Sequence, residues 1–263
     1  MSVFCITQAR LGSSRFPNKV LMPTEGIALL DYHMRRVQQS CLVDTHIVAI
    51  PDTQQDQKLE SFCRGQGYSV FKGDELNVLS RFYQAAVAFG AQADDTIIRL
   101  TGDCPLICPQ LIDEVVSSHL QKNAKGYSHL SLGYWARGLD IEVFSMATLQ
   151  QTYMKASLPM EIEHVTYYIY THPEQFTIMP IEGGNSRWAE YRLCVDESAD
   201  FVLFETIVKA LGDKWPTASG QYICELLDAK PHWIDINRDV AQKKPQGENA
   251  KQETDKMART KSA

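Results

Sequence analysis

Long apolar runs are missing from this chain of 263 residues. No stretch approaches the roughly 20 apolar residues that a membrane-spanning helix needs. The first residues also lack the charged region and long apolar stretch of a secretory signal peptide. Basic residues are in the minority, since 26 Lys and Arg face 32 Asp and Glu, giving a net charge of −6. This balance disfavours a general nucleic-acid-binding protein. We therefore predict no membrane segment and no nucleic-acid partner.

The seven cysteines contain no Cys-x-x-Cys motif. Their odd number and scattered positions argue against a disulfide framework and favour the reducing cytoplasm as the compartment. Cys104 and Cys108 are four residues apart. A zinc site there is disfavoured, because no second Cys/His pair stands at a ligand spacing.

Both common glycine-rich nucleotide motifs, GxxxxGK[ST] and GxGxxG, are also absent. A short, basic stretch follows the apolar residues 3–6 instead, and reads TQARLGSSRFPNKVL over residues 7–21. It brings Arg10, Arg15 and Lys19 close together around small, flexible residues. Main-chain N–H groups in such a turn can surround an anion, and Arg and Lys bind phosphate oxygens. Taken alone, the composition fits a nucleoside triphosphate site and a solvated basic loop about equally.

Apolar runs and helical periodicities alternate over the first 120 residues. The pattern predicts strands at 3–6, 45–50, 68–71 and 95–101, and helices at 28–40, 55–64, 77–89 and 109–120. This alternation predicts a parallel sheet with helices on both faces. Ligands of such sheets bind at the carboxyl ends of the strands. Both the basic stretch and Thr101-Gly102-Asp103 follow predicted strands, which favours a functional role for each.

The pattern changes from residue 127 to residue 192. Strands are predicted at 139–144, 176–181 and 191–195, and helices at 159–170 and 201–211. The stretch after residue 240 is rich in Lys, Gln and Glu and has almost no large apolar residues. We therefore predict a single domain over residues 1–240 and a flexible tail over 241–263.

Four blocks in this order resemble the CMP-sugar synthetase (cytidylyltransferase) superfamily, most closely its spore-coat polysaccharide SpsF-like branch. The blocks are residues 7–21, 77–83 (NVLSRFY), 99–107 (RLTGDCPLI) and 137–144 (RGLDIEVF), extended by 163–166 (EHVT) and 195–201 (VDESADF). They span about residues 3 to 205. The ordered set is much more specific than any single block.

This resemblance implies a fold, a reaction and an assembly. The implied fold is α/β, a three-layer Rossmann-like arrangement with a mostly parallel sheet (the nucleotide-diphospho-sugar transferase fold) and an inserted dimerisation lobe within 127–190. The implied reaction is Mg²⁺-dependent transfer of CMP from CTP to an acidic 2-keto sugar of the octulosonic or nonulosonic acid type. Pyrophosphate is released, and the product serves surface polysaccharide biosynthesis. The implied assembly is a homodimer.

The resemblance also implies roles for single residues. The residues implied to bind the nucleotide are Gln8, Ala9, Arg10, Gly12, Ser13, Ser14, Arg81, Thr101 and Gly102. Those implied in catalysis are Arg15, Lys19 and Asp103. Those implied to hold the metal are Asp103 and Asp196, and those implied to line the sugar site are Asp140, Glu142, Glu163 and His164.

Some positions depart from the family pattern. Phe16 and Asn18 replace the usual Leu and Gly of the first block. Ile162 stands where an Arg is common, which removes a possible cation for a substrate carboxylate. Plainer explanations also exist, because Asp103 and Asp196 could each cap a helix.

Two other functions are compatible with the sequence. One is a nucleotidyltransferase or glycosyltransferase of the same fold that uses a different nucleotide. The other is a non-catalytic nucleotide-binding partner. Retention of the basic residues together with both aspartates speaks against the second.

Overall fold

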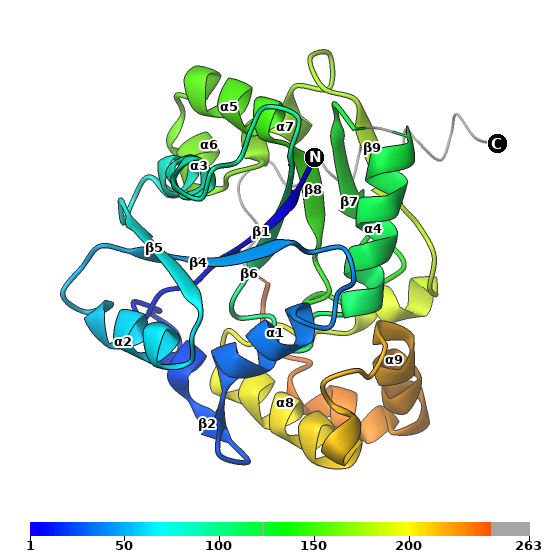
Figure 1. Cartoon of the computed structure of the whole chain (residues 1–263). Helices are drawn as coiled ribbons and strands as arrows, with labels where there is room; N and C mark the ends of the chain where they lie inside the picture. The colour runs from blue at the N-terminus through cyan, green and yellow to red at the C-terminus, as the bar shows by residue number, and fades with distance from the viewer. Residues whose placement is uncertain (123, 243–263) are drawn as a thin grey trace.

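A seven-stranded sheet forms the centre of the protein (Figure 1). The computed structural model describes residues 1–122 and 124–242. The strands are β1 (Val3–Gln8), β4 (Thr45–Pro51), β5 (Ser69–Gly73), β6 (Thr96–Thr101), β7 (Tyr127–Leu130), β8 (Glu142–Ser145) and β9 (Ile178–Ile181), with a separate two-stranded ribbon of β2 (Pro23–Thr24) and β3 (Ile27–Ala28). The sheet order is β5-β4-β1-β6-β8-β7-β9. All neighbouring pairs are parallel except those that β8 makes with β6 and β7.

Helices cover both faces of this sheet. The α-helices are α1 (Leu29–Val37), α2 (Gln57–Gly65), α3 (Val78–Ala88), α4 (Pro109–Lys122), α5 (Met146–Lys155), α6 (Pro159–Glu163), α7 (Tyr167–Thr171), α8 (Ser198–Leu211) and α9 (Gly220–Ala229). Short 3₁₀ turns lie at Lys19–Leu21, Ser186–Glu190, Gly212–Lys214 and Pro231–Ile236. The predicted three-layer α/β fold with a mostly parallel sheet is therefore confirmed.

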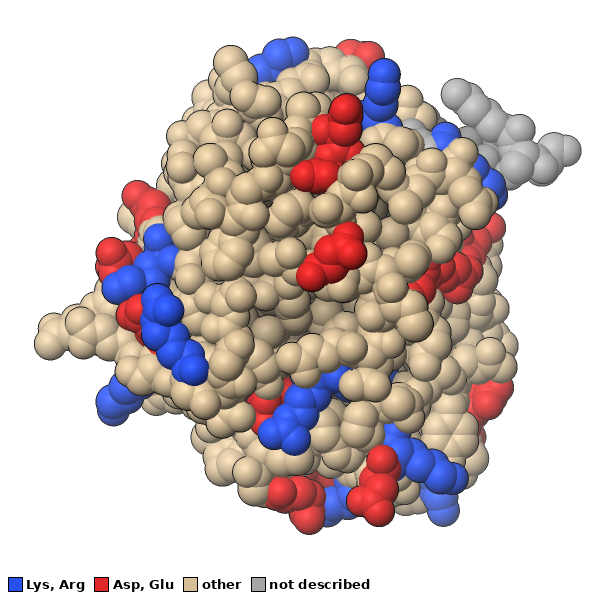
Figure 2. Space-filling view, in the orientation of Figure 1, with Lys and Arg blue, Asp and Glu red and all other residues tan. Residues whose placement is uncertain are grey.

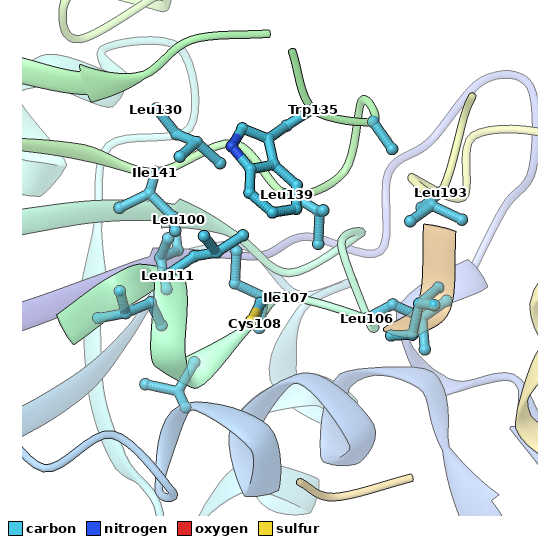
Figure 3. Packing of buried hydrophobic residues seen from close by; sticks show 14 of the residues in the cluster. Leu100, Leu106, Ile107, Cys108, Leu111, Leu130, Trp135, Leu139, Ile141 and Leu193 are labelled. Atoms are coloured by element: carbon cyan, nitrogen blue, oxygen red, sulfur yellow. The ribbon is translucent and has the colours of Figure 1, made fainter. Parts of the chain in front are cut away.

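Alternate side chains of β1 point into different hydrophobic clusters. Val3 and Cys5 pack with residues of α1, α4, α8 and α9, whereas Phe4 and Ile6 pack with residues of α3, α5 and α7. This is the period of two expected of a strand buried on both faces. Figure 3 shows part of the first cluster, where Leu100 lies near Ile107 and Leu111.

The sequence predicted β1, β4, β5 and β6 and the helices α1 to α4 near their observed positions, but two later predictions, the helix over 159–170 and the strand over 191–195, need correction. The segment 127–190, in which an inserted lobe was expected, contributes β7, β8 and β9 to the main sheet and places α5, α6 and α7 between β8 and β9. The dimerisation lobe itself stays a prediction. The helix predicted over 159–170 is divided into α6 and α7, because the backbone leaves the helical conformation at His164. Just beyond this break, the Thr166 hydroxyl donates a 3.0 Å hydrogen bond to Glu142 on β8. A tertiary contact thus overrides the local periodicity.

The strand predicted over 191–195 is an extended loop instead. Its main chain bonds to other loops rather than to a strand of the sheet: Leu193 N donates to Arg137 O over 2.6 Å, and Val195 N donates to Asp103 O over 2.8 Å. This loop passes the carboxyl edge of the sheet. It delivers Asp196 there.

The C-terminal residues and the molecular surface relate to the predicted tail and to the partners that the composition disfavoured. Ala241 and Gln242 contact arginine side chains, and the remainder of the predicted tail lies outside the described residues. Within the described ranges, no helix combines the length and apolar character needed to cross a membrane. On the face shown in Figure 2, charges of both signs are interspersed, so that side presents no broad field of one sign.

The deeply buried Arg36 side chain ties α1 to two distant loops. Its guanidinium donates to the carbonyl oxygens of Ile107 (2.6 Å) and Ala218 (2.6 Å), and also to that of Trp215. We predict that Arg36→Met lowers the free energy of unfolding by about 3 kcal/mol, because three carbonyl groups lose their donor. Urea unfolding followed by circular dichroism measures this.

Arg35→Met, on the same helix, is the matched control. Arg35 is half-exposed and forms an i,i+4 ion pair with Asp31. Its loss should cost less than about 1 kcal/mol. Equal effects of the two substitutions would contradict the role of Arg36.

Candidate active site

The loop after β1 presents unpaired main-chain donors to solvent. Within the described part of the chain, the N–H groups of Gly12, Ser14 and Arg15 make no intramolecular hydrogen bond. Asp56 anchors the start of the loop by accepting a 2.7 Å hydrogen bond from Leu11 N. Such a set of free N–H groups beside cations is suited to binding an anion.

The end of this loop explains one departure from the family pattern. Asn18 has φ 59°, in the left-handed region. Glycine adopts this conformation most easily, and Asn tolerates it better than most residues. Asn18 can therefore replace the usual glycine while the loop still turns into the 3₁₀ turn that carries Lys19.

Two aspartates from different segments converge on Lys19. Its Nζ lies 2.9 Å from Asp103 Oδ2 and 2.8 Å from Asp196 Oδ1. Lys19 follows β1, Asp103 follows β6, and Asp196 follows the returning loop. β1 and β6 are adjacent and parallel, with Gln8 paired to Thr101. This pairing brings the two strand exits together.

Further ion pairs hold Asp196 in place. Its Oδ2 lies 3.1 Å from Arg15 Nη2 and 2.7 Å from Arg192 Nη2. Arg192 Nε in turn lies 2.9 Å from the buried Asp200 Oδ1. Asp200 Oδ2 accepts hydrogen bonds from the N–H groups of Asp196 (2.9 Å) and Glu197 (3.0 Å) at the start of α8. Asp200, rather than Asp196, therefore satisfies these main-chain donors.

The opposed charges keep all three groups ionised at neutral pH. Burial raises the pKa of Asp196, but Lys19 and Arg15 outweigh it and bring the pKa down to about 2. For Asp103 burial likewise opposes the effect of Lys19, and the pKa lies below its ordinary value. Burial lowers the pKa of Lys19, whereas the two carboxylates raise it, with a net increase.

A cavity of about 260 Å³ opens beside this cluster. Its lining is strongly polar and carries charges of both signs. The lining residues are Arg15, Arg99, Thr101, Asp103, Cys104, Arg137, Asp140, Glu142, His164, Thr166, Tyr170, Cys194, Asp196 and Gln242.

The residues expected on the sugar side lie in different surroundings. Asp140, Glu142 and His164 line the cavity, whereas Glu163 is exposed and does not. Glu142 is buried, pairs with Arg99, and accepts hydrogen bonds from Tyr127 and Thr166. Its carboxylate is therefore part of the cavity wall. Asp140 accepts a 2.7 Å hydrogen bond from Gly138 N.

The residues expected on the nucleotide side lie around the carboxyl ends of β1, β5 and β6. Gln8 ends β1 and Thr101 ends β6. A Cβ on Gly102 would lie only 3.0 Å from Leu30 Cδ1 and 3.2 Å from Gln8 O, so close packing favours glycine there. Ala9 is buried and Arg10 is exposed, as are Gly12 and Ser14, while Ser13 is half-buried.

Arg81 lies away from the cavity. It is buried, and its guanidinium donates to the carbonyl oxygens of Asp74 and Glu75 in the loop after β5. Burial, with a smaller contribution from Arg10, lowers the pKa of Arg81 to about 10. Its visible role is to hold this loop, whereas Arg10 is exposed.

Several residues of the site had no assigned role in the sequence, among them Arg99, Arg137, Arg192 and Gln242. Arg99 and Arg137 line the cavity and stand within the family blocks at 99–107 and 137–144, so their positions carried a signal. Arg192 and Gln242 lie outside all blocks. Only the tertiary structure brings them to the site, where Arg192 contacts both Asp196 and Gln242.

The carboxylates fit a hard cation, since the Lys19 ammonium already stands between them as a positive charge. Across residues 1–122 and 124–242, no group of three or more His, Cys, Asp or Glu is arranged to hold a metal ion. Mg²⁺ typically uses one or two carboxylates and completes its shell with phosphate oxygens and water. Asp103 and Asp196 match this pattern.

Comparison with known proteins places this arrangement in a family. A family model described as cytidylyltransferase matches residues 4–244. The spore coat polysaccharide biosynthesis protein SpsF of Bacillus subtilis is 32% identical over 241 residues, covering 87% of this chain and 95% of SpsF. An 8-amino-3,8-dideoxy-manno-octulosonate cytidylyltransferase of Shewanella frigidimarina is 33% identical over 117 residues, covering 44% of this chain and 47% of that protein.

A solved structure agrees over nearly the whole chain. It is a cytidylyltransferase from Leptospira borgpetersenii, with a TM-score of 0.83 and 26% identity. The match covers 93% of this chain and 100% of that one. The sequence match and the shared architecture show that this chain belongs to the cytidylyltransferase family.

Proposed function

We propose that this protein transfers CMP from CTP to an acidic 2-keto sugar of the octulosonic or nonulosonic acid type, releasing pyrophosphate. The observation that carries the proposal is the convergence of Asp103 and Asp196 on one cation, between an anion-binding loop and a polar cavity. The product would serve surface polysaccharide biosynthesis, a role supported by the similarity to SpsF. We also propose that the protein works in the cytoplasm as a homodimer.

The loop after β1 would hold the triphosphate. The free N–H groups of Gly12, Ser14 and Arg15 can bind phosphate oxygens. Arg10, Arg15 and Lys19 add three cations to these donors. Concentrated positive charge is what the departing pyrophosphate requires, because catalysis of such transfers consists mainly of positioning and charge neutralisation.

Asp103 and Asp196 would hold Mg²⁺. When bound, the metal would act as a Lewis acid that polarises a phosphoryl oxygen. The chain's own contribution is to keep both carboxylates charged and fixed. Arg15 and Arg192 pair with the Asp196 carboxylate. The main-chain hydrogen bond from Val195 N to the Asp103 carbonyl oxygen holds the Asp103 backbone in place.

The cavity would hold the acceptor. Its lining includes Arg15, Arg99 and Arg137, which together provide positive charge for an acid. Arg99 pairs with Glu142, and Arg137 Nη1 lies 3.5 Å from Asp140 Oδ1. Similarity to an octulosonate cytidylyltransferase over part of the chain supports an acidic sugar as the acceptor. The cavity would place its hydroxyl toward the α-phosphorus, and the free N–H groups would orient the triphosphate for that attack.

A pyrophosphate-release assay tests the proposed reaction. With Mg²⁺, we expect release from CTP, and much less from UTP, GTP or ATP, only when a keto-sugar acid is present. Asp103→Asn should reduce kcat by about a hundredfold or more, since a fixed charge at the reacting phosphate is lost.

The control for this substitution is Asp235→Asn, which changes an exposed aspartate paired with Arg238. It should leave turnover unchanged, and both variants should keep the circular dichroism spectrum of the native protein. Undiminished turnover in Asp103→Asn would refute the metal role. Release that is equally fast from all four nucleotides would refute the assignment of CTP.

Removal of Lys19 should strengthen metal binding while it weakens catalysis. In the free protein the Lys19 ammonium competes with a metal for both carboxylates. We predict that Lys19→Met binds Mn²⁺ without nucleotide roughly tenfold more tightly, which corresponds to about 1.4 kcal/mol of relieved competition. Electron paramagnetic resonance of free Mn²⁺ measures this affinity directly.

Arg15→Met is the comparison for this prediction. Arg15 contacts Asp196 but does not lie between the two aspartates, so its removal should change Mn²⁺ affinity less. Weaker Mn²⁺ binding in Lys19→Met than in the native protein would show that Lys19 does not stand at the metal position.

A further inference from the structure

A chain of hydrogen-bonded side chains runs beneath the site and ends at the residue next to Asp103. Thr7 Oγ1 lies 2.8 Å from His46 Nε2 and 2.9 Å from His33 Nε2. His33 Nδ1 lies 2.9 Å from the carbonyl oxygen of Cys104. Thr7 and His33 are completely buried. The chain therefore links β4, β1 and α1 to the turn that follows β6.

The Cys104 carbonyl oxygen, at one end of this hydrogen-bond chain, sets the donor and acceptor roles of every bond in it. The Cys104 carbonyl can only accept, so His33 Nδ1 carries a hydrogen. Burial lowers the pKa of His33 to about 4, so the ring is neutral at pH 7 and its Nε2 accepts. The Thr7 hydroxyl must then donate to His33, and it accepts in turn from His46 Nε2–H.

The surroundings of His46, at the other end of the hydrogen-bond chain, are consistent with these donor and acceptor roles. Burial lowers the pKa of His46 to about 3, so this ring is neutral as well. With its hydrogen on Nε2, His46 Nδ1 carries none. That atom is inaccessible to solvent and has no hydrogen-bond partner among the described residues. An unpartnered N–H there would be costly, and this tautomer avoids it.

The turn at which this hydrogen-bond chain ends also carries Asp103, whose carboxylate would hold the metal. Asp103 immediately precedes Cys104, its carbonyl accepts from Val195 N, and its side chain meets Lys19. The Cys104 carbonyl also accepts from Ile107 N over 3.2 Å, so His33 is its second donor. His33 enters from α1, independently of the main-chain bonds within the turn.

We propose that Thr7 and His33 are positioning residues, which fix the Cys104–Pro105 peptide and with it the turn that carries Asp103, so that the Asp103 carboxylate faces the same point as Asp196. This inference rests on the proposed function. Apolar side chains would fill the space between the sheet and α1 without unpaired polar atoms. A chain of neutral donors and acceptors supplies in addition a directed bond to one specific carbonyl.

Breaking the hydrogen-bond chain at its middle residue, Thr7, provides the first test. Thr7→Val keeps the shape of the side chain but removes the hydroxyl, and we expect kcat to fall at least tenfold. The Mn²⁺ dissociation constant measured with CTP should rise several-fold, whereas the KM for CTP should change less than twofold. Thr7→Ser keeps the hydroxyl and should restore kcat and Mn²⁺ affinity to near-native values.

A variant that loses stability elsewhere separates positioning from mere destabilisation. Thr152→Val removes a buried hydroxyl of α5 that donates to Thr148 O over 2.9 Å. It should lower Tm but leave kcat and Mn²⁺ affinity of the folded protein unchanged. If Thr7→Val behaves in the same way, the inference is overturned.

Substitutions of His33 give a second, independent comparison should Thr7→Val not fold. The amide of His33→Gln can both accept from Thr7 and donate to Cys104, whereas His33→Leu can do neither. We expect His33→Gln to retain at least tenfold more of kcat than His33→Leu. Equal loss in both would overturn the inference. A native protein that neither releases pyrophosphate nor binds Mn²⁺ with CTP would instead refute the proposed function.

Discussion

The placement of Lys19 between two aspartates is the constraint on which the site depends. Asp103 and Asp196 would repel each other if brought together alone, and burial would raise the pKa of both. A single ammonium 2.9 Å and 2.8 Å from their oxygens makes the arrangement stable. These three residues follow β1, β6 and the loop that returns past the sheet edge. The site therefore exists only when β1 pairs with β6 and that loop bonds to the Asp103 turn.

The surrounding structure holds this charge cluster at several levels. Arg15 and Arg192 neutralise the second oxygen of Asp196, and the buried Asp200 anchors Arg192. Beneath the site, His33 reaches the turn that follows Asp103. A polar cluster fixed in advance costs little reorganisation when a charged ligand arrives, which is the condition for effective electrostatic catalysis. Folding therefore assembles this charge cluster before any ligand binds.

Local sequence patterns predicted most elements of the first half of the fold, although not the short ribbon of β2 and β3. Short apolar runs alternate with amphipathic stretches there, and each type of periodicity reports its own element. The pattern failed where a distant contact decided the structure. The helix predicted over 159–170 breaks beside Thr166, whose hydroxyl bonds to Glu142, and residues 191–195 pair with two loops rather than with a strand. A period of two or of 3.6 carries no information about such partners.

The sequence by itself determined the α/β class, the order of the early elements, the basic loop and the family to which the chain belongs. It also identified Lys19, Asp103 and Asp196 as candidates, because they stand in motifs that can be read locally. Only the tertiary structure decided that one ammonium bridges both aspartates, that Glu142 is bound by Arg99 while Glu163 is exposed, and that Arg192 and Gln242 reach the site. The physical reason is that these contacts join residues 43 to 177 positions apart. Their geometry comes from strand pairing and loop return, which no local pattern encodes.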